Sequence, residues 1–357
     1  MNLLKTTLFL VLFISLFGCN ESEDDNSDYL ALFINEEDFT LISGDKASIK
    51  IKINSDDVIK LRLLYNDSII KTWNAPKQTN DSDSKPLQFV FETKGLPLGT
   101  SVIRLQTETS GKADFLDDEK AITIWNKKAP ELKTLTVITS YPHDPSSYTQ
   151  GLEFFNGQLY EGTGDPGQKG ESKLLKVDLK SGKSLKTVPL KKPYFGEGIT
   201  ILNDQVYQLT WRGKLCRVYA LKTLKEEKSF SYSGEGWGLC NDGSNLIMSN
   251  GSHTISFRDP KTFETIKTIE VCTDKGFVEQ LNELEYINGE IYANIYTSNL
   301  IAIINPNTGG VRAIINANNL EALGKGEDGD YFNGIAYNKN LFVTGKFWNK
   351  LFEVKID

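Results

Sequence analysis

The chain repeats one short phrase five times, beginning with Gln150-Gly151-Leu152 and ending with Asn333-Gly334-Ile335. In each copy a polar or aromatic residue precedes glycine or its equivalent, and Leu or Ile follows before a turn and a second apolar stretch. The three copies in between read Glu197-Gly198-Ile199, Trp237-Gly238-Leu239 and Asn282-Glu283-Leu284. Successive copies begin 47, 40, 45 and 51 residues apart. This period is typical of β-propeller blades.

Equivalent positions of successive propeller blades converge around one axis. The first residues of the five copies should therefore form a ring in space, although they are scattered along the chain: Gln150, Glu197, Trp237, Asn282 and Asn333. We expect the strand Leu135–Ser140 to share the last blade with the C-terminal strand Leu351–Ile356. That pairing would close the ring.

The domain organisation follows from where the repeats lie. We predict an all-β chain in which a small immunoglobulin-like β-sandwich at residues 29–126 precedes a five-bladed β-propeller at residues 132–357. The sandwich is predicted from seven short strand-like stretches, with Asn66-Asp67 as a tight hairpin turn. Residues 127–131 contain Pro130 after two lysines, a composition that indicates a linker.

The first 19 residues have the pattern of a bacterial lipoprotein signal peptide. Lys5 supplies a positive charge, residues 8–17 are predominantly apolar, and Leu16-Phe17-Gly18-Cys19 resembles a lipobox with Cys19 as the lipidated residue. The alternative is a membrane-spanning anchor, but about 12 apolar residues are too few for about 30 Å of hydrocarbon. Residues 20–28 are acidic and polar, as in a tether. The sequence thus predicts lipid anchoring at the bacterial cell envelope, on its periplasmic face or at the cell surface.

Charge and cysteine content exclude other classes. The net charge is −7 and no basic stripe is present, so we expect no nucleic-acid partner. Cys216 and Cys240 could pair between blades, but three buried thiols, with Cys272 as the third, is the simpler interpretation. With no Cys-x-x-Cys pair and only two histidines, we expect no zinc site and no cofactor. A structural calcium ion in the channel stays open.

The second strand of each repeat adds a further set of residues to the ring. Thr163, Trp211, Asn250, Tyr296 and Lys346 lie 13 or 14 residues after the ring residues. Tyr148 and Phe195 precede two of the ring residues by two positions, on the same strand face. The sequence therefore predicts a cup around Glu197, with Asn282 and Lys346 as its polar partners and with aromatic walls: Tyr148, Phe195, Trp211, Trp237 and Tyr296.

Six ordered motifs resemble the plant-type glutaminyl cyclases, which also occur in bacteria and form five-bladed propellers. The motifs are Tyr148–Leu152, Phe195–Thr200, Leu209–Trp211, Glu235–Leu239, Leu281–Glu285 and Thr344–Lys346. The resemblance covers residues 135–357 and leaves out the N-terminal domain. It implies that the N-terminal glutamine of a peptide or protein is converted to pyroglutamate with release of ammonia, without a cofactor.

The resemblance also assigns roles to individual residues. It implies that Glu197 shuttles protons, that Asn282 and Trp237 lie near the polar groups of the substrate with Gln150 beside them, and that Lys346 lies close to the carboxylate. Four aromatic residues would wall the pocket: Tyr148, Phe195, Trp211 and Tyr296. The chain departs from the family at two of these walls, because Tyr148 and Tyr296 stand where Phe and Trp are common.

The implied reaction needs no enzyme nucleophile, since the substrate's own amine attacks its own carboxamide. Other interpretations stay open. Glu197 could simply cap backbone amides in a turn, and the chain could be a non-catalytic propeller lipoprotein that binds a protein or peptide partner at the cell envelope. A propeller hydrolase is a third class, but the ring lacks the histidines that such a metal site uses.

Overall fold

The computed structural model describes residues 29–34, 39–79, 85–110, 112–167 and 172–357. Cys19 and the predicted signal peptide and tether lie outside the described residues. The chain is all-β, as predicted, with one short helix, α1 (Asn318–Gly324), that the sequence analysis did not anticipate. No helix within the described ranges is long and apolar enough to cross a membrane.

The N-terminal part consists of two facing sheets. A three-stranded sheet has the order β1-β3-β6 and a five-stranded sheet the order β2-β8-β7-β4-β5. Alternate residues such as Ile49 and Ile51 of β3 and Leu61 and Leu63 of β4 are fully buried between the two sheets. The strands are β1 (Ala31–Phe33), β2 (Phe39–Ile42), β3 (Lys46–Ile53), β4 (Val58–Tyr65), β5 (Ser68–Asn74), β6 (Leu87–Glu92), β7 (Gly99–Thr109) and β8 (Lys112–Trp125).

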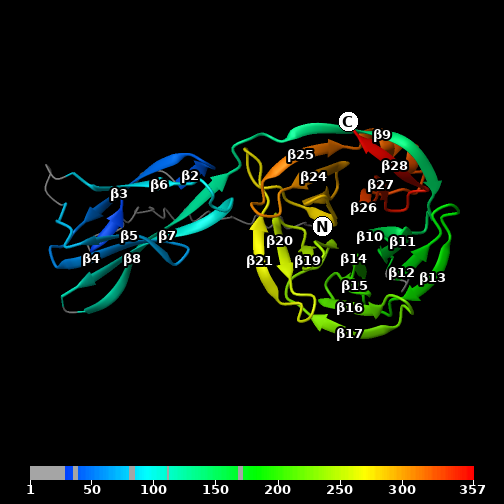
Figure 1. The fold of residues 1–357 in the computed structure, drawn as a ribbon, viewed down its shortest axis with the longest axis horizontal. Coiled ribbons are helices and arrows are strands. Elements are labelled where there is room, and N and C mark those ends of the chain that lie inside the picture. Colours follow the sequence, from blue (N-terminus) through cyan, green and yellow to red (C-terminus); the bar gives the residue numbers. More distant parts are fainter. Residues whose placement is uncertain (1–28, 35–38, 80–84, 111, 168–171) are drawn as a thin grey trace, which may run out of the picture.

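The remaining strands form a ring of antiparallel sheets (Figure 1). Three separate four-stranded sheets are β10 (Tyr148–Phe155) to β13 (Ser184–Pro189), β14 (Gly196–Leu202) to β17 (Glu226–Ser231) and β18 (Leu239–Asn241) to β21 (Thr265–Glu270). Their middle strands are β11 (Gln158–Gly164), β12 (Lys173–Val177), β15 (Gln205–Thr210), β16 (Leu215–Ala220), β19 (Leu246–Ser249) and β20 (Thr254–Arg258).

An eight-stranded sheet completes the ring, and β9 (Glu131–Pro142) joins its two halves. The first residues of β9 pair in parallel with β25, and the rest pairs antiparallel with β28, from Leu135 opposite Ile356 to Pro142 opposite Lys350. The predicted pairing of both ends of the repeat region is therefore confirmed. The halves are β22 (Leu281–Ile287), β23 (Glu290–Ile295), β24 (Leu300–Ile304) and β25 (Val311–Asn316), and β26 (Phe332–Asn338), β27 (Asn340–Gly345) and β28 (Lys350–Ile356).

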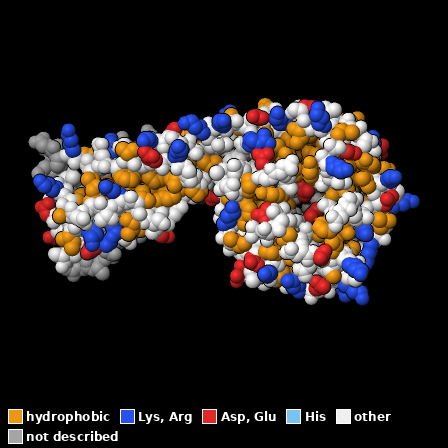
Figure 2. Space-filling model, viewed as in Figure 1, with side chains coloured by type: hydrophobic (Ala, Val, Ile, Leu, Met, Phe, Trp, Pro, Cys, Tyr) orange, Lys and Arg blue, Asp and Glu red, His pale blue; other side chains and the backbone are white. Residues whose placement is uncertain are grey.

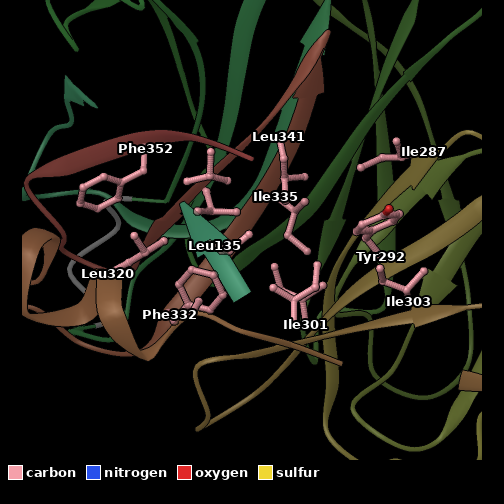
Figure 3. Close-up of a cluster of buried hydrophobic side chains, with 14 of the residues drawn as sticks. Leu135, Ile287, Tyr292, Ile301, Ile303, Leu320, Phe332, Ile335, Leu341 and Phe352 are labelled. Atoms are coloured by element: carbon pink, nitrogen blue, oxygen red, sulfur yellow. The ribbon is translucent and has the colours of Figure 1, made fainter. Parts of the chain in front are cut away.

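Apolar side chains hold these two halves together. Leu135 of β9 lies in a buried cluster with Ile301 of β24, Ile335 of β26 and Phe352 of β28 (Figure 3). Leu320 of α1 belongs to the same cluster, so the unexpected helix covers one end of this core.

The repeated glycines let neighbouring inner strands approach each other closely. The inner strands β10, β14, β18, β22 and β26 contact one another in that order, and β26 contacts β10. A Cβ atom on Gly151 would lie 2.4 Å from Ile199 N, and one on Gly238 would lie 1.9 Å from Asn282 O. Any larger residue would push the strands apart. The fourth copy carries Glu283 instead, and its carboxylate accepts hydrogen bonds from Leu152 N and Ile335 N on two other inner strands.

Candidate functional site

The eight residues that the sequence analysis assigned to the cup line one cavity of about 270 Å³, together with Gln150, which the resemblance placed beside them. Figure 2 shows acidic side chains near the middle of the round part of the molecule. The lining consists of Tyr148, Gln150, Phe195, Glu197, Trp211, Trp237, Asn282, Tyr296 and Lys346, with Asp165 and Pro166 in addition. Asp165 and Pro166 follow β11, and sequence reasoning missed them because no equivalent acid recurs in the other repeats.

β-Bulges lie at four of the five ring residues, and three of these four residues line the cavity. The strand register shifts between Thr149 and Gly151, between Gly196 and Ile199, between Leu281 and Leu284, and between Phe332 and Ile335. Each shift therefore lies at a ring residue: Gln150, Glu197, Asn282 and Asn333. A bulge re-aims the side chain of the extra residue, and bulges often lie beside functional sites.

Glu197 is the central acid of the cavity, and its side chain is 4% exposed. Burial raises the pKa of Glu197 well above its usual range, while the positive charge of Lys346 and a hydrogen bond with Gln150 oppose that rise. Asn333 Nδ2 in turn donates to Gln150 Oε1 at 3.2 Å. Asn333 therefore lies behind the cavity wall and orients Gln150 toward Glu197.

Lys346 is buried between two aromatic rings. Its Nζ lies 4.7 Å from the ring centre of Tyr148 and 4.5 Å from that of Tyr296. Burial lowers the pKa of Lys346 to about 8, although the charges of Glu197 and Asp330 favour the ammonium form. The two tyrosines that depart from the family pattern are thus a pair that encloses one ammonium group.

Glu235 supports two walls of the cavity, and the sequence analysis assigned it no role. Its Oε2 accepts hydrogen bonds from Trp211 Nε1 at 2.7 Å and from Trp237 Nε1 at 3.0 Å. Its Oε1 accepts a third from Arg212 Nε at 3.1 Å. Desolvation alone would raise the pKa of Glu235, but the hydrogen bonds from both indoles lower it below its usual range.

The only N–H of the Trp237 indole donates to Glu235, so this indole lines the cavity without a free donor. Asn282 also lines the cavity, and its Oδ1 is buried without a partner among the described residues, so this oxygen can accept a hydrogen bond from a ligand N–H.

Two residues that the sequence analysis placed near the ring on second strands, Thr163 and Asn250, lie outside the cavity lining. Asn250 Oδ1 accepts from Ser252 N and so caps a turn, while Thr163 Oγ1 accepts from Lys173 N.

Cys216, Cys240 and Cys272 are buried free thiols, as the simpler interpretation held. Within the described ranges, no cluster of three or more His, Cys, Asp or Glu side chains is arranged to hold a metal ion.

Comparison with known proteins defines the class. The profile of the family described as glutamine cyclotransferase matches residues 112–356, well over half of the chain. The chain therefore belongs to the glutamine cyclotransferase family.

Two relatives agree with this assignment. The chain is 38% identical over 233 residues to the glutaminyl-peptide cyclotransferase of Arabidopsis thaliana, an alignment that covers 63% of this chain and 72% of that protein. The crystal structure of Myxococcus xanthus glutaminyl cyclase superposes with a TM-score of 0.60 at 35% identity and covers 64% of this chain and 98% of that one. The resemblance drawn from the six motifs is thereby confirmed.

Proposed function

We propose that the chain is a glutaminyl-peptide cyclotransferase that converts the N-terminal glutamine of peptides or proteins to pyroglutamate and releases ammonia. The observation that carries the proposal is one buried carboxyl, Glu197, whose pKa is raised inside an aromatic cavity of about 270 Å³. A cavity of that size is small for a ligand site and suits a single residue. Membership of the glutamine cyclotransferase family supports an enzyme of this kind.

In the proposed mechanism Glu197 is the general base and then the general acid. The substrate's α-amine has an ordinary pKa of about 7.7–8.0 and is mostly protonated at neutral pH. The reacting form is the neutral amine, which has first lost its extra proton to solvent. As its nitrogen attacks the carbon of the side-chain carboxamide, one N–H proton passes to Glu197. The same proton then passes to the departing nitrogen, the old C–N bond breaks, and ammonia leaves. A carboxyl whose pKa is raised well above its usual range by burial suits both steps.

The other cavity residues hold the substrate in a reactive conformation and stabilise the negative charge that develops on it. Asn282 and Lys346 offer an amide and an ammonium group to the oxygen on which negative charge develops. The rings of Tyr148, Phe195 and Trp211 hold the glutamine side chain folded over its own amine and exclude water. Gln150 keeps the Glu197 carboxylate oriented between the two proton transfers.

We further propose the architecture and location that go with this activity. The cyclic contacts of five inner strands support a five-bladed propeller for residues 132–357, and the two facing sheets support an immunoglobulin-like sandwich for residues 29–126. Limited proteolysis tests the boundary, since cleavage within residues 127–131 should leave a folded C-terminal fragment. The sequence pattern around Cys19 supports lipid anchoring at the bacterial cell envelope.

Substitution of Glu197 tests the mechanism. Glu197→Gln keeps size and hydrogen bonding but cannot carry the proton, so kcat for ammonia release from a Gln-initiated dipeptide should fall by about 10²- to 10⁴-fold. Asn282→Ala should reduce kcat less, because the proton path remains. The wild type should lose activity at low pH, where the amine and Glu197 both keep their protons.

Glu153→Gln is the matched control. Glu153 is also a buried glutamate with a raised pKa, but it accepts a hydrogen bond from Ile201 N and lies outside the cavity lining. Its conversion to glutamine should leave kcat near the wild-type value. Near-normal turnover in Glu197→Gln would return Glu197 to a structural role. Absence of any pyroglutamate from the wild type would favour the non-catalytic alternative.

A further inference from the structure

A second cavity of about 330 Å³ adjoins the first. The two cavities share Asp165, Phe195 and Trp211 as lining residues, so the second begins at the wall where the first ends. Lys192, Tyr194 and Arg212 line its other sides. Both cations are exposed, whereas Asp165 is 8% exposed and lies where the cavities meet. The solvent end of the second cavity is therefore positively charged.

Arg212 is held in a defined position at this end. Its guanidinium lies 4.1 Å from the ring centre of Trp211, and its Nε donates to Glu235. Its terminal nitrogens have no hydrogen-bond partner recorded among the described residues, so they can donate to a carboxylate or a carbonyl. Lys192 likewise has no ion pair recorded within the described part of the chain. Glu235 balances part of the charge of Arg212 but does not line the second cavity.

We propose that the second cavity receives the residues that follow the N-terminal glutamine, and that Lys192 and Arg212 favour a carboxylate there. The proposal rests on the proposed function, because only a peptide substrate continues beyond its first residue. If the first cavity buries that residue, the chain must leave past the shared wall. Two further residues span about 7 Å. The carboxylate can belong to an acidic side chain at the second or third position, or to the free C-terminus of a dipeptide.

Substrate charge tests the proposal on the full chain. Ammonia release is measured at low ionic strength with glutamine amide, Gln-Ala-NH2, Gln-Glu-NH2, Gln-Lys-NH2 and the free acid Gln-Ala. Each exposed ion pair contributes about two- to fivefold, so kcat/KM for Gln-Glu-NH2 should exceed that for Gln-Lys-NH2 by about tenfold. The ratio should shrink in 1 M salt, where exposed charges are screened. A higher kcat/KM for Gln-Ala than for Gln-Ala-NH2 would show that the main-chain carboxylate of a dipeptide can also occupy the second cavity.

Lys191→Glu is the matched control for Lys192→Glu, because Lys191 is the exposed preceding residue but does not line the second cavity. Lys192→Glu should remove or reverse the preference for Gln-Glu-NH2, and Lys191→Glu should keep it. A ratio near one in the wild type, or the same ratio in both variants, would overturn the subsite while leaving the cyclotransferase proposal standing. Failure to cyclise even glutamine amide would overturn the proposed function and the subsite with it.

Discussion

At the scale of single residues, Glu235 links the cavity's shape to its electrostatics. One carboxylate oxygen accepts from the indoles of Trp211 and Trp237, and hydrogen bonds to an ionised group are about twice as strong as neutral ones. The same negative charge raises the pKa of Glu197. Glu235 is therefore a positioning residue that also tunes the central acid.

Replacing Glu235 should change both properties. Glu235→Ala frees two indoles, so kcat/KM should fall by about ten- to hundredfold if about 1.5–3 kcal/mol of charged hydrogen bonding is lost. Glu235→Gln removes the charge while keeping an oxygen for the indoles. The pKa of Glu197 should then fall, which moves the acid limb of the kcat/KM profile to lower pH. Intrinsic tryptophan fluorescence gives an independent readout of the walls.

The control is Glu227→Gln, an exposed glutamate on β17 whose recorded contact is with Gln205. It should leave the pH profile and the fluorescence unchanged. An unshifted acid limb in Glu235→Gln would show that Glu235 has no electrostatic effect on catalysis.

At the scale of elements, a buried ionic pair joins two segments that carry cavity residues. His143, in the connection from β9 to β10, has Nδ1 2.7 Å from Trp348 O and Nε2 3.2 Å from Glu161 Oε1. Both nitrogens face acceptors, so the ring is satisfied as a doubly protonated imidazolium. Glu161 also accepts from Thr149 Oγ1 at 2.7 Å. Tyr148 directly precedes Thr149, and Lys346 lies two residues before Trp348, so these hydrogen bonds tie together the two segments that carry Tyr148 and Lys346.

This pair should make stability depend on pH. Burial is the largest single effect and lowers the pKa of His143, but attraction to Glu161 and the hydrogen bonds with Glu161 and Trp348 O together outweigh it, and the pKa is raised. A raised folded pKa gives stabilisation that is fully present below the unfolded value of about 6.5 and is lost as the pH rises through the folded value. Denaturant unfolding should therefore show that the free energy of unfolding of the wild type falls over that range.

Two variants separate the effect of the ionic charges of His143 and Glu161 from the effect of their packing. His143→Leu leaves Glu161 buried and unpaired, so it should lower the free energy of unfolding by about 3–5 kcal/mol. Glu161→Gln can donate to a neutral His143, so it should lose little stability and most of the pH dependence. Equal pH dependence in Glu161→Gln and the wild type would contradict the ionic pair.

Elements also show how far the sequence could predict the structure. The repeat period and its glycines were enough to place the inner strands and the cavity residues, because one bulge recurs beside Gln150, Glu197, Asn282 and Asn333. β2 was missed because it is a four-residue strand that pairs in parallel with the distant β8. The role of Glu235 depends on where two indole side chains point, which spacing along the chain does not specify.

At the scale of the whole molecule, the two-sheet part and the ring share an apolar contact. Leu98 and Ile124 pack with Cys272 of the ring, and the ring of Trp125 lies edge-on to Phe277 at 4.7 Å. Thr100 N donates to Glu270 Oε2 at 2.6 Å. These contacts hold the N-terminal part against the ring beside β21.

The proposed lipid anchor is tested at this scale. Cys19→Ser removes the thiol that would carry the lipid, so the variant should leave the membrane fraction and accumulate as uncleaved precursor. Cell fractionation measures the release from the membrane, and mass spectrometry of the N-terminus measures the uncleaved precursor. Unchanged membrane retention would point to a different anchor.

The chain enters and leaves the ring at the same place. Asp357 N donates to Thr134 O at 3.1 Å, next to the pairing of Leu135 with Ile356. Adjacent ends make a domain suited to circular permutation, in which the ends are joined and the chain is opened at an exposed turn such as Asp178–Gly182. Every inner strand would keep its neighbours in such a rearrangement. A permuted ring should therefore keep the cavity, because the cavity depends on which inner strands are neighbours and not on where the chain begins within the ring.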